Sequence, residues 1–166
     1  MNAPVWLSDS EQCTWRAFLE ASQRLFEHLD RELQHDAGIP LTYYTILAML
    51  SEAPERTLRM SELARLTWSS RSRLSHAVDR LEEKGWVTRL SCPSDKRGAF
   101  AVLTDEGYSV LEAAAPSHVQ SVRRHLFDQL TSEQVAQLGA VSRAIAEHLG
   151  SAPDATELTP RHIPAD

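Results

Sequence analysis

The sequence predicts a mainly α-helical fold with one small β-hairpin, and three observations support this prediction. Apolar residues recur at steps of three and four along most of the chain, which is the period of amphipathic helices. The segment 86–103 instead holds two runs of β-forming residues on either side of a polar loop. The chain has 166 residues, of which 42% are hydrophobic and 24% charged, as in ordinary globular proteins. We therefore expect no extensive disorder.

The first predicted helix follows a flexible leader at residues 1–9. Ser8 and Glu11 have the spacing of a capping box, in which a hydroxyl and a carboxylate satisfy the first free backbone amides. The apolar residues that follow share one helix face, and they are Trp15, Phe18, Leu19, Leu25, Phe26, Leu29 and Leu33. Gly38 and Pro40 are predicted to end this helix.

Two shorter helices are predicted next. Thr42 is placed to cap a helix that ends at residues 52–54. Residues 57–58 are predicted to form a short strand, and residues 60–66 a third helix.

A polar turn at residues 67–69 leads into a fourth helix, which is capped by Ser69 or Ser70 and runs to Lys84. Gly85 follows at the position where a left-handed C-terminal cap belongs. The apolar face of this helix is predicted to pack inward, and it consists of Leu74, Ala77, Val78 and Leu81.

Residues 86–90 and 99–103 are predicted to be the two strands of a hairpin, joined by a polar loop at residues 91–98. The third and fourth predicted helices followed by this hairpin are the layout of a winged helix-turn-helix.

Two more helices are predicted after the hairpin. Thr104 caps the fifth, in which a kink is expected at Pro116. Thr131 and Gln134 form a second capping box that opens the sixth helix. This helix ends at Gly150, and residues 151–166 are predicted to be a flexible tail.

The net charge of −6 by itself argues against nucleic acid as a partner, because a phosphate backbone attracts positive charge. The distribution of the charges reverses this conclusion. Residues 56–98 carry ten lysines and arginines and five acids, which gives +5, whereas the rest of the chain carries seven bases and eighteen acids, which gives −11. A basic segment within an acidic chain indicates a face that binds nucleic acid.

The polar face of the fourth predicted helix is the first candidate contact with DNA. Its first half holds serines, arginines and a histidine but no acid. The N-terminal residues of a recognition helix enter the major groove, where arginine can bind guanine through two hydrogen bonds. Acids occupy only the second half, and they are Asp79, Glu82 and Glu83. There they would lie farther from DNA and brace Arg80 or Arg89. The alternative is a solvated polar face.

The predicted hairpin tip is the second candidate contact. Lys96 and Arg97 place two cations there, and a narrow positive tip suits the negative potential of a minor groove. Asp95 would orient Arg97 or cap the turn. The alternative is a charged turn that only keeps the loop soluble.

Three blocks of this sequence together resemble the MarR family of bacterial transcription regulators, and they are Arg80-Leu81-Glu82-Glu83-Lys84-Gly85-Trp86-Val87, Ser94-Asp95-Lys96-Arg97-Gly98 and Leu103-Thr104-Asp105-Glu106-Gly107. Residues 42–47 and 60–64 resemble that family's second and third helices. The resemblance covers about residues 10–150.

The resemblance implies a homodimer that binds a palindromic operator in double-stranded DNA, usually as a repressor. It implies a dimerisation helix at residues 10–37, a winged helix-turn-helix lobe for DNA at residues 41–104, and further dimerisation helices at residues 105–150. By position it implies minor-groove contact by Arg97, with Lys96 beside it. Together with the polar helix face, the candidate DNA-binding residues are Ser69, Ser70, Arg71, Ser72, Arg73, Ser75, His76, Arg80, Lys96 and Arg97.

The family also implies a possible small aromatic or phenolic ligand, bound between the dimer helices and the DNA-binding lobe. The candidate residues are Trp15, Phe18, Tyr43 and Tyr44, with Arg16 as a counter-charge. The alternative is core packing for the aromatic residues and a solvated Arg16.

Redox or metal sensing within the same fold is a further alternative. Cys13 lies near the start of the first helix, but Asp9 and Glu11 oppose a lowered thiol pKa there. The histidine pairs at helical spacing are seven residues apart, too far for two ligands of one ion on a single helix, and they are His28 with His35 and His118 with His125. We predict no metal and no cofactor.

The sequence predicts no enzyme, since it lacks a glycine-rich phosphate loop, an HExxH motif and a nucleophile elbow. A winged-helix adaptor for protein interactions is the alternative from another class, and the basic helix and hairpin tip argue against it. No apolar run approaches the roughly eighteen residues of a membrane span, and no signal peptide is expected. Two cysteines fit a reducing cytoplasm.

Overall fold

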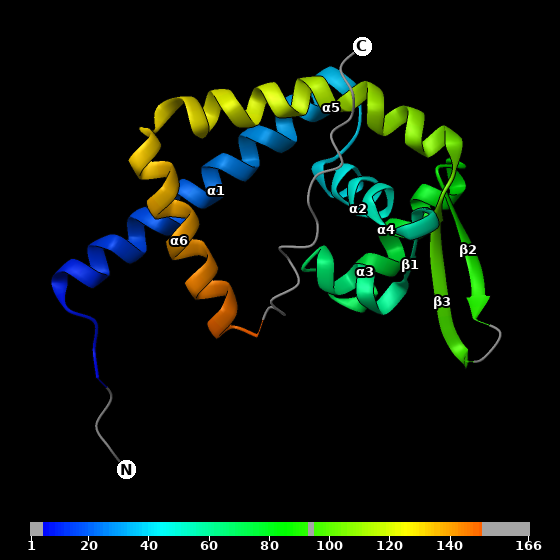
Figure 1. Ribbon diagram of the computed structural model, residues 1–166, viewed down its shortest axis with the longest axis horizontal. Coiled ribbons are helices and arrows are strands. Elements are labelled where there is room, and N and C mark those ends of the chain that lie inside the picture. Colours follow the sequence, from blue (N-terminus) through cyan, green and yellow to red (C-terminus); the bar gives the residue numbers. More distant parts are fainter. Residues whose placement is uncertain (1–4, 93–94, 151–166) are drawn as a thin grey trace.

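The computed structural model describes residues 5–92 and 95–150, without the side chains of residues 92–97 (Figure 1). The described elements are, in chain order, α1 (Asp9–Ala37), α2 (Leu41–Glu52), β1 (Thr57–Arg59), α3 (Met60–Leu66), α4 (Arg71–Glu83), β2 (Val87–Cys92), β3 (Asp95–Leu103), α5 (Asp105–His125) and α6 (Ser132–His148). Short 3-10 turns lie at Pro54–Arg56 and Phe127–Gln129. This order confirms the predicted fold class, a mainly helical protein with a small hairpin.

The strands form one antiparallel sheet in the order β1-β3-β2. Both strands of the predicted hairpin are confirmed, but β3 begins at Asp95 rather than at Ala99. Pairing continues through Ser91 opposite Ala99 and then shifts register to Cys92 opposite Asp95. The strands therefore take up most of the predicted loop, because an irregularity in the ladder lets them keep pairing. The remaining loop residues, 93–94, lie outside the described part.

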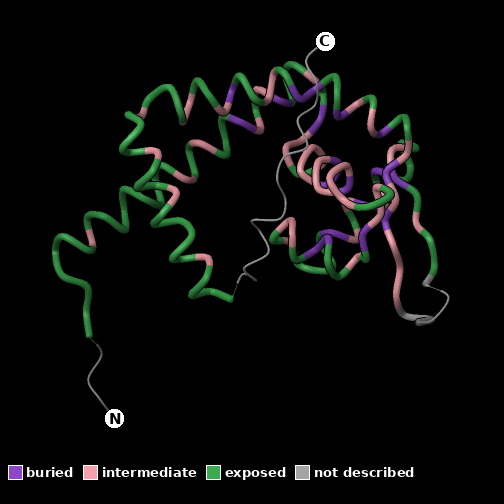
Figure 2. Tube along the Cα trace, viewed as in Figure 1, coloured by how far each residue is buried: buried purple, intermediate pink, exposed green. Residues whose placement is uncertain are grey.

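One hydrophobic core joins α2, α3, α4 and the sheet. Its fully buried side chains come from all of these elements, and they include Ile46, Leu47, Leu50, Leu63, Leu74, Val78, Leu81 and Val87. Figure 2 shows this concentration of buried residues on the right of the molecule. We call residues 41–104 the lobe.

The other three helices, α1, α5 and α6, form what we call the arm. Helices α1 and α5 pack along each other and extend away from the lobe (Figure 1). Their seam buries Leu33 and Ala114 near the lobe, whereas α6 contains no buried residue. The arm is consequently the exposed part of the molecule (Figure 2). Helix α5 continues through Pro116 as one helix.

Most of the predicted caps are confirmed. Ser70 caps α4, Thr104 caps α5, and both predicted capping boxes are present. Gly85 has a φ of 75°, the left-handed conformation expected after α4. The prediction that Thr42 caps α2 is wrong, because Pro40 occupies the N-cap position, the helix begins at Leu41, and Thr42 is already inside it.

The cap of α2 comes from a different helix. The backbone N–H of Leu41 donates to Asp30 Oδ1 of α1 at 2.8 Å, and the Pro40 carbonyl accepts from the N–H groups of Tyr43 and Tyr44. A carboxylate at a helix N-terminus also suits the helix dipole. This contact attaches the lobe to the arm.

Candidate nucleic-acid interface

Helix α4 presents a polar face opposite its buried side. Leu74, Val78 and Leu81 point into the core of the lobe. The exposed side chains include Arg71, Ser72, Arg73, His76 and Arg80, all predicted at sequence level to contact DNA. The folding of this lobe therefore brings these residues together on one surface.

Arg71 and Arg73 are the cations at the N-terminal end of α4. Within the described residues neither makes an ion pair, and no acid lies in the first turn of the helix. The unpaired N–H groups of a helix N-terminus add a partial positive charge. This end of α4 can therefore attract an anion such as a phosphate.

The serines in α4 and just before it differ in how many of their hydrogen-bonding groups have a partner. Ser70 Oγ accepts the N–H of Arg73 at 3.3 Å as the helix cap. Ser69 is half-buried, and its hydroxyl donates to the Thr67 carbonyl at 3.2 Å. Ser75 is also half-buried and is contacted by Arg89. Ser72 is exposed.

The acids of α4 are paired with arginines. Arg80 or Arg89 is the partner predicted from the sequence, and both arginines take part. Glu83 Oε2 accepts from Arg80 Nη1 at 2.8 Å, and this contact raises the pKa of Arg80. Asp79 and Glu82 both contact Arg89 of β2. The acids are thus neutralised within the lobe, and they do not form an unpaired negative patch.

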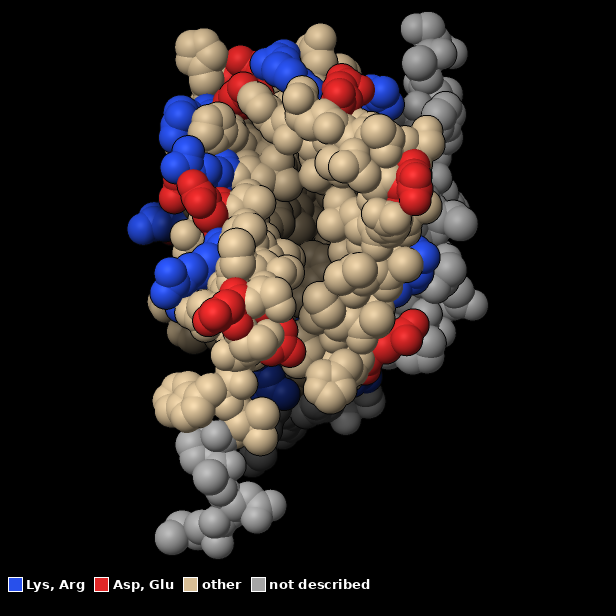
Figure 3. Space-filling model, turned by 90° about the vertical axis from the view of Figure 1, so that its left-hand side faces the viewer, with Lys and Arg blue, Asp and Glu red and all other residues tan. Residues whose placement is uncertain are grey.

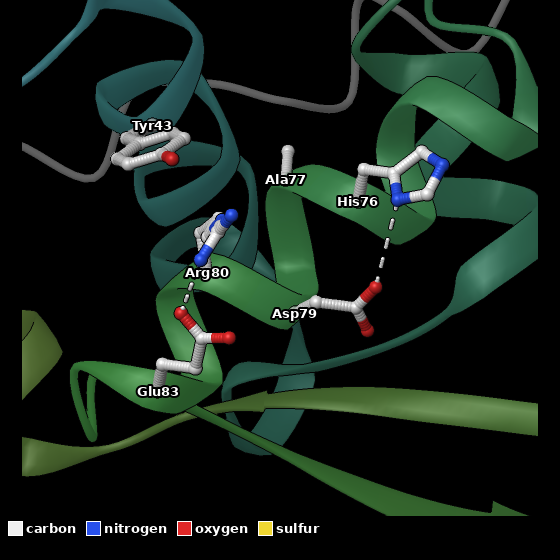
Figure 4. A pocket seen from close by; sticks show the side chains of 6 residues that line it. All are labelled: Tyr43, His76, Ala77, Asp79, Arg80 and Glu83. Carbon is white, nitrogen blue, oxygen red and sulfur yellow. Dashed lines mark hydrogen bonds and ion pairs between the residues drawn. The ribbon is translucent and has the colours of Figure 1, made fainter.

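A shallow pocket of about 490 Å³ lies between α2 and α4 (Figure 4). Tyr43 lies on its α2 side and Arg80 reaches toward it from α4. His76 Nδ1 lies 3.9 Å from Asp79 Oδ2. Most of the residues that line this pocket are polar or charged. The pocket therefore suits a hydrated polar contact better than an apolar ligand.

The candidate residues at the hairpin tip, Lys96 and Arg97, belong to β3. Their side chains lie outside the part of the chain that the structure describes.

The candidate ligand residues do not gather at one point of this chain. Trp15 and Phe18 stack on the exposed half of α1, with ring centroids 6.2 Å apart, and Arg16 beside them is exposed. Tyr43 lines the pocket next to α4. Tyr44 instead packs on His118 of α5, with ring centroids 4.3 Å apart. Burial raises the pKa of Tyr44 and lowers that of His118.

A second, larger pocket of about 690 Å³ lies between α1, α2 and the α3–α4 turn. Phe26 and Trp68 contribute aromatic rings, and Glu27 and Asp30 contribute carboxylates. Trp68 is 84% exposed and has a φ of 47°, which is unusual for a bulky residue. None of these four residues is among those predicted from the sequence to contact DNA or a ligand.

Folding brings together one histidine from each of the two pairs noted in the sequence. The rings of His28 and His125 lie 5.6 Å apart across the α1–α5 seam, and His125 Nε2 is 2.8 Å from Glu32 Oε1. Among the described residues, however, no group of three or more histidine, cysteine or acidic side chains is placed to hold a metal ion. Cys13 is exposed on α1.

The arm carries an uncharged surface of its own. Figure 3 shows a hollowed, mostly uncharged face with lysines, arginines and acids along its edges. Large apolar side chains that remain exposed on the arm are Trp15, Phe18, Leu19 and Phe26 of α1, Val119 of α5 and Leu138, Val141 and Ile145 of α6. Exposed apolar surface of this extent marks an interaction site. Separately, none of the described helices is long and apolar enough to span a membrane.

Comparison with known proteins gives consistent results. The family model described as "MarR family" matches residues 37–98. The Streptomyces coelicolor MarR family transcriptional regulator Sco3205, solved in complex with DNA, is 55% identical, and the match covers 92% of this chain and 95% of that chain with a TM-score of 0.85. AbsC, a MarR family regulator from the same organism, is 45% identical over 88% of this chain and 98% of its own, with a TM-score of 0.81.

A more distant relative is the transcriptional repressor MprA of Escherichia coli strain K12. It is 27% identical over 135 residues, which are 81% of this chain and 75% of the repressor. The two Streptomyces matches include both the lobe and the arm.

Proposed function

Because the chain belongs to the MarR family of transcriptional regulators, we propose that it binds an operator in double-stranded DNA as a homodimer. The observation that carries this proposal is the exposed face of α4, where Arg71, Arg73 and His76 lie together without a competing acid in the first turn. Sco3205, at 55% identity, was solved in complex with DNA.

We further propose that α4 enters the major groove with its N-terminal half first. The contacts come from Ser69, Ser70, Arg71, Ser72, Arg73, Ser75, His76 and Arg80. Arginine there can bind guanine through two hydrogen bonds, and hydroxyl groups can bind phosphates or base edges. The family resemblance and the local charge support a minor-groove contact by Lys96 and Arg97 at the end of the hairpin.

The exposed apolar face of the arm supports the homodimer. Alone in water, this face would leave the rings of Phe18 and Phe26 and the aliphatic side chain of Val141 hydrated. A two-fold partner of the same sequence would cover it with an identical face, and would place two copies of α4 against two halves of a palindromic operator.

Repression is the regulatory outcome that we propose, because the relative MprA is named a transcriptional repressor. A small aromatic or phenolic ligand that relieves repression would bind in the assembled dimer, since Trp15 and Tyr44 do not meet within one chain. We place the protein in the cytoplasm, where both cysteines stay reduced.

The test begins with selection of duplexes from a random DNA library by the purified protein. We expect a palindromic sequence to emerge and its affinity to fall steeply with salt. If the dimer neutralises six phosphates, the slope of log K against log salt is about −5. Failure to enrich any sequence, or binding that is indifferent to salt, would contradict the proposal.

Arg97→Ala tests the hairpin contact. We expect affinity for the selected duplex to fall by about tenfold, because one cation leaves the groove, while the protein stays dimeric in sizing chromatography. Binding equal to that of the wild type would remove Arg97 from the interface.

A further inference from the structure

A single arginine of the hairpin contacts Ser75, Asp79 and Glu82 of α4. Arg89, on β2, donates from Nη2 to the Ser75 carbonyl at 2.8 Å and lies 3.3 Å from Ser75 Oγ through the same nitrogen. Its Nη1 donates to Asp79 and lies 3.8 Å from Glu82 Oε2. The Arg89 side chain is only 26% exposed, so water competes weakly for these contacts.

The backbone of Arg89 joins the same cluster. Its N–H donates to Glu82 Oε1 at 3.0 Å. Ser75, Asp79 and Glu82 are spaced by four and three residues and therefore share one face of α4. One strand residue is thus fixed to two turns of the helix, on the side next to the hairpin.

We propose that Arg89 is a positioning residue, which sets the rotation of α4 relative to the hairpin and thereby the reading of operator sequence. This inference rests on the proposed binding of DNA by α4. The buried side of α4 consists of Leu74, Val78 and Leu81, and apolar packing alone is not directional. Hydrogen bonds from Arg89 add the direction, since a guanidinium presents its donors in a fixed plane.

Arg89 also controls the chemistry of Ser75. A hydroxyl has one hydrogen and two lone pairs, and Ser75 Oγ accepts from Arg89. Its own hydrogen is then free to point away from Arg89, toward an acceptor on a base or phosphate. Arg89 therefore turns a half-buried serine into an oriented donor.

Neutralisation of the acids is the second effect. Asp79 and Glu82 are the acids of α4 that contact Arg89, and unpaired they would repel the phosphate backbone. A lysine could supply the charge but not the fork that reaches Ser75 and Asp79 together. The positioning role therefore requires arginine.

Asp79→Asn separates positioning from simple electrostatics. Removal of a negative charge near DNA should tighten binding if charge alone matters. If Asp79 instead anchors Arg89, the variant should bind the selected duplex about tenfold more weakly. A duplex of the same composition but shuffled sequence serves as the non-specific probe, and on it the variant should bind as well as the wild type or better.

Arg89→Gln and Arg89→Lys test the arginine itself. Both should lose about tenfold in affinity for the selected duplex with the salt slope of the wild type, because no phosphate contact is removed. Lys84→Gln, which removes an exposed cation between α4 and β2, is the matched control and should bind normally. Thermal unfolding confirms that each variant is folded at the temperature of the assay.

Three results would overturn the inference. Tighter binding by Asp79→Asn would show that only charge matters. A slope reduced by about one in Arg89→Gln and restored in Arg89→Lys would make Arg89 a phosphate contact. Normal affinity in both Arg89 variants would show that the contacts of Arg89 with α4 have no role in recognition of the operator sequence. If the wild type selects no duplex at all, the proposed function fails instead.

Discussion

In the lobe, Leu47 and Val78 are completely buried, whereas in the arm Phe18 and Val141 have more than half of their surface in water. The lobe therefore satisfies its apolar residues within one chain. The arm does so only along the α1–α5 seam, and its remaining apolar face requires a second chain. Stability of the lobe and stability of the arm should accordingly depend on different variables, the first on packing and the second also on protein concentration.

The largest effect is expected from a charge placed on the apolar face of the arm. Val141→Asp would bury a carboxylate in the proposed dimer interface, so we expect a monomer in sizing chromatography and loss of operator binding. Ala140→Asp, on the far side of α6, is the matched control and should stay dimeric. A dimeric Val141→Asp protein would contradict the role given to α6.

Truncation of a core side chain in the lobe should have a smaller effect than Val141→Asp. The loss of stability should be the same in the monomer and in the dimer. Leu47→Ala removes a fully buried side chain, and we expect the free energy of unfolding to fall by about 3 kcal/mol. The same loss is expected in the Val141→Asp background, measured by urea unfolding. Phe18→Ala should behave differently, and should destabilise only the dimeric protein. An equal cost of Phe18→Ala in both backgrounds would remove the distinction between lobe and arm.

One carboxylate of α1, Glu32, makes several contacts across the seam between α1 and α5. Glu32 accepts a hydrogen bond from Ser121 and lies 2.8 Å from His125 Nε2 and 3.4 Å from Arg124 Nη1. We expect Glu32→Gln to lower the free energy of unfolding by about 1 kcal/mol. The matched control is Glu20→Gln, which removes a solvent-exposed ion pair with Arg24 and should change almost nothing.

The pH dependence of Glu32 follows from the same contacts. Hydrogen bonds from Ser121 and His125 lower the pKa of Glu32 from its usual 4.5. The unfolded chain therefore binds this proton first as the pH falls, and the contribution of Glu32 is lost below about 4.5. The difference in unfolding free energy between wild type and Glu32→Gln should accordingly shrink in acid. A constant difference would show that Glu32 does not titrate differently on folding.

Much of this architecture could be predicted from local sequence signals. The periodicity of the helices, the capping boxes and Gly85 each depend on neighbouring residues only, and folding preserved them. The cap of α2 could not be predicted this way, because Asp30 is distant in sequence and reaches Leu41 only through packing. The exposed face of α4 could also be predicted, because its apolar residues recur at helical spacing on the opposite side.

The partners of Arg89 were harder to predict from sequence. Ser75, Asp79 and Glu82 have the spacing of one helix face, but the choice between Arg80 and Arg89 as their partner depends on how β2 turns back onto α4. The structure shows that the acids divide, with Glu83 on Arg80 and the other two on Arg89. How helices pack likewise decides which of the candidate ligand residues come together. The stacked rings of Trp15 and Phe18 lie on the exposed half of α1, whereas Tyr44 packs on His118 of α5.

The last expected effect is a pH dependence through His118, where the arm meets the lobe. Its ring packs on Tyr44, and its Nδ1 is buried without a hydrogen-bond partner among the described residues. Burial lowers the pKa of His118 below its usual 6.5, so the unfolded chain binds this proton more readily than the folded one. Stability should therefore fall as the pH drops below 6.5, by at most about 1.4 kcal/mol per pH unit from one proton. His118→Gln should flatten this slope, whereas His148→Gln, which removes an exposed histidine, should leave it unchanged. Equal slopes in wild type and His118→Gln would show that the junction between arm and lobe does not respond to pH through this residue.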